Sequence, residues 1–312
     1  MSTVKVAAVQ ASPVFLDREG TTQKACALIE KAAADGAQLI VFPETFIPTY
    51  PDWVWRTKPW EETFDKLFAR LLDQSVEIPS ETTASLAEAA KQANAYVSIG
   101  VNERDGSTLY NTQLYFSPDG ELVAAHRKLM PTGGERLVWG MGDGSSLSVI
   151  DTPFGRVGGL TCWENYMPLA RAALYAQGID IYVAPTWDNS DVWVPTMRHI
   201  AKEGRMFVVS VNFRIRGSDV PASVPDRDEL YGGADDWLSR GNSVICGPHG
   251  EILAGPLTEE EGIVTAEIDP AQARAARYEF DAVGHYARPD VLQLKVNTHP
   301  ARAVTFDNTD AD

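Results

Sequence analysis

Short apolar runs alternate along the chain with segments in which apolar residues recur every three or four positions. The short runs are typical of buried strands, and the longer periodic segments are typical of amphipathic helices. Residues 21–35, for example, carry Ala25, Leu28, Ile29 and Ala32 at helical spacing. The other expected helices are 79–94, 169–177 and 193–203. The expected strands are 4–10, 39–42, 96–101, 109–116, 122–128, 149–152, 156–161, 179–184, 207–212, 242–246, 252–254 and 262–268.

Two turn sequences indicate that some of these strands form antiparallel hairpins. Ser117-Pro-Asp-Gly120 lies between the fourth and fifth expected strands, and Pro153-Phe-Gly155 lies between the sixth and seventh. Proline, aspartate and glycine are residues that tight turns favour. Hairpins mixed with alternating strands and helices predict an α/β fold, in which mixed sheets are covered by helices in a layered sandwich.

One domain is expected over residues 1–288, followed by a C-terminal tail at 289–312. The chain has no linker rich in proline, glycine or serine, and no internal repeat at a fixed period. Two stretches, 50–60 and 214–239, show no clear periodicity. Long irregular segments inside a compact domain are often binding loops or oligomer contacts, so we expect such a role for these two.

Composition narrows the class of protein. With 312 residues, 44% of them hydrophobic, the chain is long enough to bury a large core. Its three scattered cysteines do not suit a disulfide framework, which favours a reducing, cytoplasmic location. We expect no cleavable leader, because residues 1–9 lack a long apolar run with a basic flank, and no membrane span, because no later stretch is apolar for long enough. A net charge of -16 repels phosphate backbones and anionic membranes. We therefore expect neither a nucleic-acid partner nor a membrane partner.

Cys162 lies where a buried strand gives way to a helix. The strand at 156–161 begins after Gly155, and Pro168 suits the first turn of the helix that follows. A thiol near the positive end of a helix is favoured as the thiolate, which is its nucleophilic form. The alternative, from position alone, is that Cys162 is one more small apolar residue at a strand end.

Two charged residues lie at the ends of other expected strands. Glu44 follows the buried run at 39–43, and Lys128 ends the strand at 122–128. A charge beside a buried strand must be paired or functional, and a simple salt bridge is the first alternative. Together with Cys162, however, they supply a general base, a cationic stabiliser and a nucleophile. These are the groups that addition to an unsaturated carbon requires.

The chain resembles the nitrilase branch of the carbon-nitrogen hydrolase superfamily in five motifs. Three of them carry a Glu-Lys-Cys triad, and two more favour the nitrilase branch over the amidases. The motifs are Phe42-Pro-Glu-Thr-Phe46, His126-Arg-Lys-Leu129, Glu135-Arg-Leu-Val-Trp-Gly-Met-Gly-Asp-Gly-Ser145, Cys162-Trp-Glu-Asn165 and Gly284-His-Tyr-Ala-Arg-Pro-Asp290. The resemblance implies a four-layer αββα sandwich of two mixed sheets and homo-oligomers built from dimers. It also implies no metal and no organic cofactor, and it makes Glu135 a second acid of the active site.

The resemblance further implies the hydrolysis of an organic nitrile to a carboxylic acid and ammonia. Glu44 would take the thiol proton, and Cys162 would attack the nitrile carbon to give a thioimidate. Lys128 and the backbone N–H of Trp163 would stabilise the developing charge. Water would convert the thioimidate to a thioester with loss of ammonia. A second water, activated by Glu44 and oriented by Glu135, would then release the acid.

Aromatic residues gather in the loops that adjoin these motifs. Tyr50 and Trp53 lie in the first irregular stretch, and Trp187 and Trp193 flank the loop at 188–191. Each ring alone could equally belong to the core. Together with Trp163 beside the nucleophile, we expect them to form an apolar pocket for the organic part of the substrate.

Three alternatives remain open from the sequence. A cyanide dihydratase or an amidase would use the same triad. A non-catalytic oligomeric scaffold that binds a ligand could keep the fold, but it would have no use for Glu44, Lys128 and Cys162 together. A redox sensor built on Cys162 is the third. Cys26 and Cys246 are expected to be unreactive core thiols, and His126 to support the catalytic residues.

Overall fold

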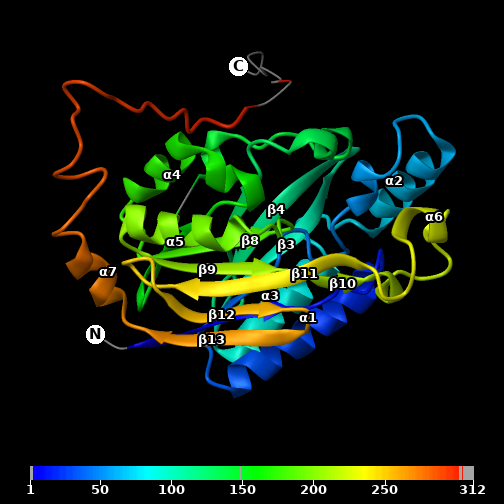
Figure 1. Ribbon diagram of the computed structural model, residues 1–312, viewed down its shortest axis with the longest axis horizontal. Helices are drawn as coiled ribbons and strands as arrows, with labels where there is room; N and C mark the ends of the chain where they lie inside the picture. Colours follow the sequence, from blue (N-terminus) through cyan, green and yellow to red (C-terminus); the bar gives the residue numbers. More distant parts are fainter. Residues whose placement is uncertain (1–2, 148, 302–303, 305–312) are drawn as a thin grey trace, which may run out of the picture.

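Two mixed β-sheets lie face to face in the computed structural model, which describes residues 3–147, 149–301 and 304 (Figure 1). The first sheet has the order β13 (Gly262–Ile268), β1 (Val4–Gln10), β2 (Leu39–Val41), β3 (Tyr96–Asp105), β4 (Thr108–Phe116) and β5 (Leu122–Arg127). The second has the order β10 (Arg214–Arg216), β11 (Trp237–Cys246), β9 (Phe207–Asn212), β8 (Ile181–Thr186), β7 (Gly155–Gly159) and β6 (Ile150–Thr152). β12 (Ile252–Thr258) pairs with β11.

The core between the sheets is built from alternate residues of their strands. In β1, Val4, Val6 and Ala8 belong to this core, whereas Ala7 and Val9 belong to a second core under the helices. The alternation follows from the two-residue repeat of a strand. Both faces of β1 are therefore buried, which explains why its residues are almost all apolar.

Helices cover both outer faces of the stacked sheets. α1 (Arg18–Ala34) and α3 (Glu81–Ala93) pack together against the first sheet. α4 (Pro168–Tyr175) and α5 (Trp193–Gly204) cover the second sheet (Figure 1). The molecule is a four-layer αββα sandwich, so the predicted fold class is confirmed.

Three helices are missing from the sequence-based expectation: α2 (Glu62–Gln74), α6 (Arg227–Tyr231) and α7 (Pro270–Ala276). α2 buries Phe64, Leu67 and Leu71, whose three- and four-residue spacing is that of an amphipathic helix. α6 and β10 lie inside the stretch 214–239, which the sequence pattern left irregular. The first irregular stretch, 50–60, contains only the single 3₁₀ turn η1 (Asp52–Trp55).

The C-terminal segment runs back across the molecule after α7. Its described residues from 277 onward form neither helix nor strand, and in Figure 1 they pass from α7 above α4. The backbone N–H of Ala301 donates to the carboxylate of Asp143 at 2.7 Å. The predicted boundary after residue 288 stays a prediction, and residues 302–303 and 305–312 of the predicted tail lie outside the described residues.

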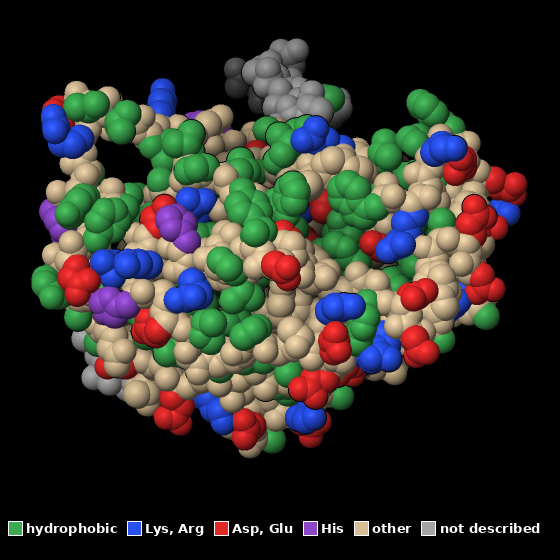
Figure 2. All heavy atoms as spheres, viewed as in Figure 1, with side chains coloured by type: hydrophobic (Ala, Val, Ile, Leu, Met, Phe, Trp, Pro, Cys, Tyr) green, Lys and Arg blue, Asp and Glu red, His purple; other side chains and the backbone are tan. Residues whose placement is uncertain are grey.

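Charges of both signs occur on the face of the molecule seen in Figure 2. Acidic and basic side chains are interspersed there. The excess of 43 Asp and Glu over 27 Lys and Arg gives the net charge of -16. None of the helices within the described residues has the length and apolar content that crossing a bilayer would need.

Candidate active site

Glu44 is held just beyond β2 by a turn that packs against β3. A Cβ on Gly100 of β3 would lie 2.2 Å from the backbone nitrogen of Thr45 and 2.5 Å from the carbonyl oxygen of Pro43. Only glycine allows this close approach. The backbone N–H of Gly100 donates to the Pro43 carbonyl at 3.1 Å, which fixes the turn. The sequence therefore delivers the Glu44 carboxylate to the space between the two sheets in one defined position.

The Glu44 carboxylate is fully buried and fully engaged. Its Oε1 accepts a hydrogen bond from the backbone N–H of Trp187 at 2.7 Å. Its Oε2 accepts from Asn111 Nδ2 at 2.9 Å and lies 3.5 Å from Lys128 Nζ. Burial raises the pKa of Glu44, against the opposing effect of Lys128, and Glu135 adds to the rise. A carboxylate with a raised pKa is a better proton acceptor, as a general base requires.

Lys128 follows the last residue of β5 and continues its pairing with β4. Its backbone N–H donates to the Asn111 carbonyl at 2.8 Å, so Asn111 contacts Lys128 through its backbone and Glu44 through its side chain. The ammonium is buried between two carboxylates, 2.7 Å from Glu135 Oε2 and 3.5 Å from Glu44 Oε2. Burial alone would lower the pKa of Lys128, but the two carboxylates outweigh burial and raise it. The side chain is therefore a fixed positive charge.

Glu135 lies in the 3₁₀ turn η2 (Gly133–Leu137) and is buried. Its Oε2 accepts from Lys128 Nζ and from the backbone N–H of Thr132, each at 2.7 Å. Its Oε1 accepts from the Tyr50 hydroxyl at 2.7 Å. The structure thus brings Glu135 next to Lys128 and Glu44, and its predicted role as an acid of the active site stays a prediction. It also gives Tyr50 a polar contact with the catalytic cluster that the sequence did not suggest.

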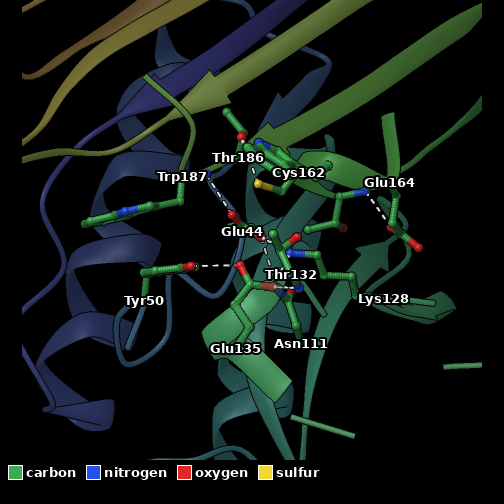
Figure 3. Close-up of polar contacts among 12 residues, drawn as sticks. Glu44, Tyr50, Asn111, Lys128, Thr132, Glu135, Cys162, Glu164, Thr186 and Trp187 are labelled. Carbon is green, nitrogen blue, oxygen red and sulfur yellow. Dashed lines mark hydrogen bonds and ion pairs between the residues drawn. The ribbon is translucent and has the colours of Figure 1, made fainter. Parts of the chain in front are cut away.

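Cys162 occupies an abrupt turn between β7 and the 3₁₀ turn η4 (Cys162–Tyr166). Its φ of +52° lies in the left-handed region, which costs a non-glycine residue about 1–2 kcal/mol. Asn165 Nδ2 holds the turn by donating to the Cys162 carbonyl at 2.8 Å and the Leu160 carbonyl at 2.9 Å. The strained turn points the sulfur at Glu44 (Figure 3).

The thiol is almost fully buried, and its pKa lies well above the ordinary value. Burial is the main cause, and the Glu44 carboxylate adds to it, while Lys128 opposes both. The expectation of a thiolate favoured by a helix is contradicted, because α4 begins only at Pro168 and two carboxylates lie nearer. The raised pKa favours the neutral thiol as the resting form of Cys162.

A second buried carboxylate, Glu164, joins the segments that carry Lys128 and Cys162. Its Oε1 accepts from the backbone N–H of Leu129, and its Oε2 from that of Thr161, both at 2.7 Å. His126 Nε2 lies 3.1 Å from the same carboxylate. Burial alone would raise the pKa of Glu164, but His126 and the backbone donors lower it. His126 therefore contacts Glu164, and its predicted supporting role stays a prediction.

Comparison with known proteins agrees with this geometry. The sequence profile described as carbon-nitrogen hydrolase matches residues 5–278. The chain belongs to the carbon-nitrogen hydrolase family. An aliphatic nitrilase of Sinorhizobium fredii is 47% identical over 97% of this chain and 99% of its own length. Nitrilase 2 of Arabidopsis thaliana is 44% identical over 97% of this chain and 91% of its own. A bifunctional nitrilase/nitrile hydratase of Nicotiana tabacum is 44% identical over 98% and 90% of the two chains.

Solved structures share the fold of this carbon-nitrogen hydrolase at lower sequence identity. Nit3 of Saccharomyces cerevisiae, a member of branch 10 of the nitrilase superfamily, superimposes with a TM-score of 0.68. It is 23% identical, and the match covers 91% of this chain and 96% of that one. The NitFhit protein of C. elegans gives a TM-score of 0.75 at 20% identity, covering 97% of this chain and 69% of that one. The predicted resemblance to the nitrilase branch is confirmed by the three relatives named above.

An aromatic cavity of about 470 Å³ in this carbon-nitrogen hydrolase is lined by Cys162 and Glu135. The Tyr50 and Trp187 rings stack at 4.5 Å between centroids and form one wall. Trp163, which is half exposed, lies on another side, where its Nε1 donates to Asp188 Oδ2 at 2.9 Å. The residues that line the cavity are Tyr50, Trp55, Thr132, Glu135, Cys162, Trp163, Trp187, Asp188, Asn189 and Ser190.

Two of the tryptophans predicted to line the pocket do not reach it. Trp53 is fully buried in the core beneath the loop, because the η1 turn directs its ring inward. Trp193 is fully buried under α5, where its Nε1 donates to Ser210 Oγ at 2.9 Å. Trp55, two residues after Trp53, lines the cavity instead, and its Nε1 donates to the Tyr50 hydroxyl at 3.1 Å.

Other reactive side chains lie away from the cluster. Cys246 is buried at the end of β11. Cys26 is only partly buried on α1, so it is not the enclosed core thiol that the sequence suggested. Within the described residues, no three His, Cys, Asp or Glu side chains are grouped so as to hold a metal ion.

Proposed function

We propose that the protein is a nitrilase that converts an organic nitrile to the carboxylic acid and ammonia through a covalent intermediate on Cys162. The observation that supports this most is the convergence of Glu44, Lys128 and Cys162 (Figure 3) beside an aromatic cavity that Cys162 lines. A base and a fixed cation lie 3.5 Å apart there, and both act electrostatically on the thiol. The named nitrilases at 44–47% identity support the same reaction.

In the first half of the reaction, Glu44 takes the proton from the Cys162 thiol. The sulfur attacks the nitrile carbon, so that an S–C bond forms and one C–N π bond breaks. The nitrogen takes up the proton held by Glu44, which gives a neutral thioimidate. Lys128 lies beside Glu44 and favours the negative charge that builds on the nitrogen in the transition state. The backbone N–H of Trp163 is the second donor we assign to that position.

In the second half, a water molecule gives a proton to Glu44 and adds to the thioimidate carbon. The nitrogen of the adduct takes up the proton held by Glu44, and the proton of the new hydroxyl group also moves to the nitrogen through Glu44. The tetrahedral adduct then collapses with loss of ammonia, which leaves a thioester on Cys162 and a deprotonated Glu44. A second water, deprotonated by Glu44 and oriented by Glu135, adds to the thioester carbon. The S–C bond then breaks, the sulfur recovers a proton, and the carboxylic acid leaves. If the first adduct instead expels sulfur, the product is the amide.

The decisive experiment is an ammonia-release screen over aliphatic, aromatic and arylacetonitrile substrates, with the matching amides and cyanide measured in parallel. A nitrilase should release ammonia from at least one organic nitrile far faster than from the corresponding amide or from cyanide. Ammonia from amides alone, or from cyanide alone, would favour an amidase or a cyanide dihydratase. Ammonia from none of the three classes would favour a non-catalytic scaffold.

The volume of the cavity leads to a prediction about substrate size. About 470 Å³ is far more than hydrogen cyanide fills, whereas each buried methylene contributes about 0.8 kcal/mol, or roughly fourfold in binding. We expect kcat/KM to rise from acetonitrile through longer alkyl nitriles to phenyl-bearing ones. Trp187→Ala should flatten this series, because Trp187 forms a wall of the cavity with Tyr50.

Trp60→Ala is the matched control, since Trp60 is 93% exposed and lies outside the cavity lining. A wild-type maximum at cyanide would contradict the assignment.

A second prediction concerns Glu135, which accepts a hydrogen bond from Lys128. In the proposed reaction Glu44 is the base, and Glu135 only orients the second water. Glu135→Gln should still be acylated on Cys162, but we expect deacylation to slow by roughly a hundredfold because its water is poorly oriented. Single-turnover mass spectrometry would then show the acyl adduct accumulating. Complete and rapid loss of the adduct would remove Glu135 from the hydrolytic step.

A further inference from the structure

The last residue of β8, Thr186, contacts the reacting sulfur directly. Its hydroxyl donates a hydrogen bond to Cys162 Sγ at 3.3 Å, and both residues are buried (Figure 3). The backbone N–H of Asp188 donates to the same hydroxyl oxygen at 2.9 Å. A hydroxyl carries one hydrogen, and the Asp188 N–H occupies a lone pair of the oxygen. The hydrogen of Thr186 is therefore directed at the sulfur before any substrate binds.

The groups around the Cys162 sulfur disfavour a thiolate, so a hydrogen bond from the Thr186 hydroxyl has a large effect on its ionisation. Charged or ionisable groups act on Cys162 from several elements of both sheets. Two carboxylates disfavour a thiolate, and the ammonium of Lys128 already lies 2.7 Å from one of them and 3.5 Å from the other. The charged or ionisable groups that act on Cys162 are Glu44 after β2, Tyr50 in the following loop, Lys128 after β5, Glu135 in η2 and Tyr166 in η4. Ionising the thiol is thus costly, and a neutral donor aimed at sulfur lowers that cost without a further charge.

We propose that Thr186 is a further catalytic residue, whose hydroxyl stabilises the Cys162 thiolate as it forms. The inference rests on the proposed function, in which Cys162 is the nucleophile. When Glu44 takes the thiol proton, the negative charge on sulfur strengthens the hydrogen bond from Thr186, which keeps its own hydrogen. When the S–C bond forms, sulfur loses that charge and the hydrogen bond weakens. When the S–C bond of the thioester adduct breaks, the negative charge returns to sulfur, and the hydrogen bond from Thr186 stabilises it again.

A purely structural role for Thr186 would have a different signature. Through the Asp188 N–H, Thr186 also steadies the loop whose Asp188 carboxylate holds Trp163 on the cavity wall. Losing that contact would change how the organic part of the substrate fits, and so would change KM and the order of preferred nitriles. It would not change the ionisation of the thiol. The reactivity of Cys162 toward a small alkylating reagent separates the two roles.

The test compares wild type with Thr186→Val, which keeps the shape and removes the hydroxyl, and Thr186→Ser, which keeps the hydroxyl. Iodoacetamide alkylation of the Cys162 peptide is followed by mass spectrometry from pH 6 to pH 10, with Cys26 in the same chain as internal reference. For Thr186→Val we expect Cys162 alkylation at neutral pH to slow by about 10- to 100-fold, the loss of one hydrogen bond to a charged group. Its pH profile should move to higher pH, and kcat should fall by a similar factor, while Cys26 reacts as in wild type.

Thr186→Ser should restore most of the rate, because the donor is back. If Thr186→Val does not fold, Thr186→Ala makes the same comparison with a smaller side chain. Coincident Cys162 profiles in Thr186→Val and wild type would overturn the inference, and so would a Thr186→Ser variant as impaired as Thr186→Val. Because alkylation needs no nitrile, a shifted profile in a protein that hydrolyses no nitrile would contradict the proposed function alone. Coincident profiles in an active nitrilase would contradict this inference alone.

Discussion

Cys162→Ala is expected to abolish turnover while the protein keeps its fold. Every step of the proposed reaction passes through a bond to Sγ, and alanine offers no atom that can form it. Losing the nucleophile of a covalent mechanism costs on the order of 10⁴-fold or more in kcat. The fold should survive because the substitution removes one atom from a side chain that lines a cavity and whose sulfur accepts one hydrogen bond, from Thr186. Ammonia release and circular dichroism check the two halves of this expectation.

The wild-type enzyme should also show the intermediate. Denaturing mass spectrometry of a quenched reaction should find an acyl group on the peptide that contains Cys162. Cys26→Ala is the matched control, since it removes a partly exposed thiol that lies on α1. That variant should keep wild-type turnover. An adduct on Cys26 or Cys246, with none on Cys162, would contradict the assignment of the nucleophile.

Lys128→Met is expected to be close to inactive. Methionine fills most of the same volume but removes the positive charge that faces the developing negative nitrogen, and losing such a donor typically costs about 10²–10³-fold in kcat. Water cannot take over the stabilising role of the lost positive charge, because the Lys128 ammonium is fully buried. Initial rates of ammonia release on the best nitrile measure the effect. Near wild-type turnover in a folded variant would mean that Lys128 and Glu44 form only a structural salt bridge.

The stability of this variant has to be measured beside its activity. Removing Lys128 leaves the carboxylates of Glu44 and Glu135 buried together without their cation, and breaking a buried ion pair from one side can cost about 3–5 kcal/mol. The double variant Lys128→Met, Glu135→Gln removes one of the two carboxylates and should regain part of the lost melting temperature. It should not regain activity, which separates a catalytic loss from a folding loss.

The sequence singles out Glu44, Lys128 and Cys162 because strand ends can be recognised in it. Glu44 follows the apolar run at 39–43, whereas Lys128 and Cys162 lie at or just beyond the ends of the expected strands 122–128 and 156–161. The sequence does not show that these strands belong to two different sheets, which the structure brings face to face. Asn111 and Thr186 gave no comparable signal. Asparagine and threonine are ordinary residues at the positions they occupy, and only the pairing of β4 with β5 and the position of β8 bring them to Glu44 and Cys162.

The sequence also does not show which side chains of a loop face the core and which face the cavity. Trp53 and Trp55 lie two residues apart in one 3₁₀ turn, yet one ring is fully buried in the core and the other lines the cavity. A loop has no fixed repeat from which to read its faces. The ionisation of Cys162 cannot be read from the sequence for a related reason. Its pKa is raised by burial and by the carboxylates of Glu44 and Glu135, which come from distant parts of the chain.

The catalytic cluster is assembled from both sheets of the sandwich. Glu44 and Lys128 extend from β2 and β5 of the first sheet, whereas Cys162 and Thr186 extend from β7 and β8 of the second. Glu164 bonds the backbone beside Lys128 and the backbone beside Cys162 with the same carboxylate, so one side chain sets the alignment of the two layers where they meet. In the proposed reaction, turnover depends on how these two layers fit together, because a misplacement of about 1 Å can cost about a hundredfold in rate. We therefore expect a small shift of one sheet along the other to stop the reaction before either sheet unfolds.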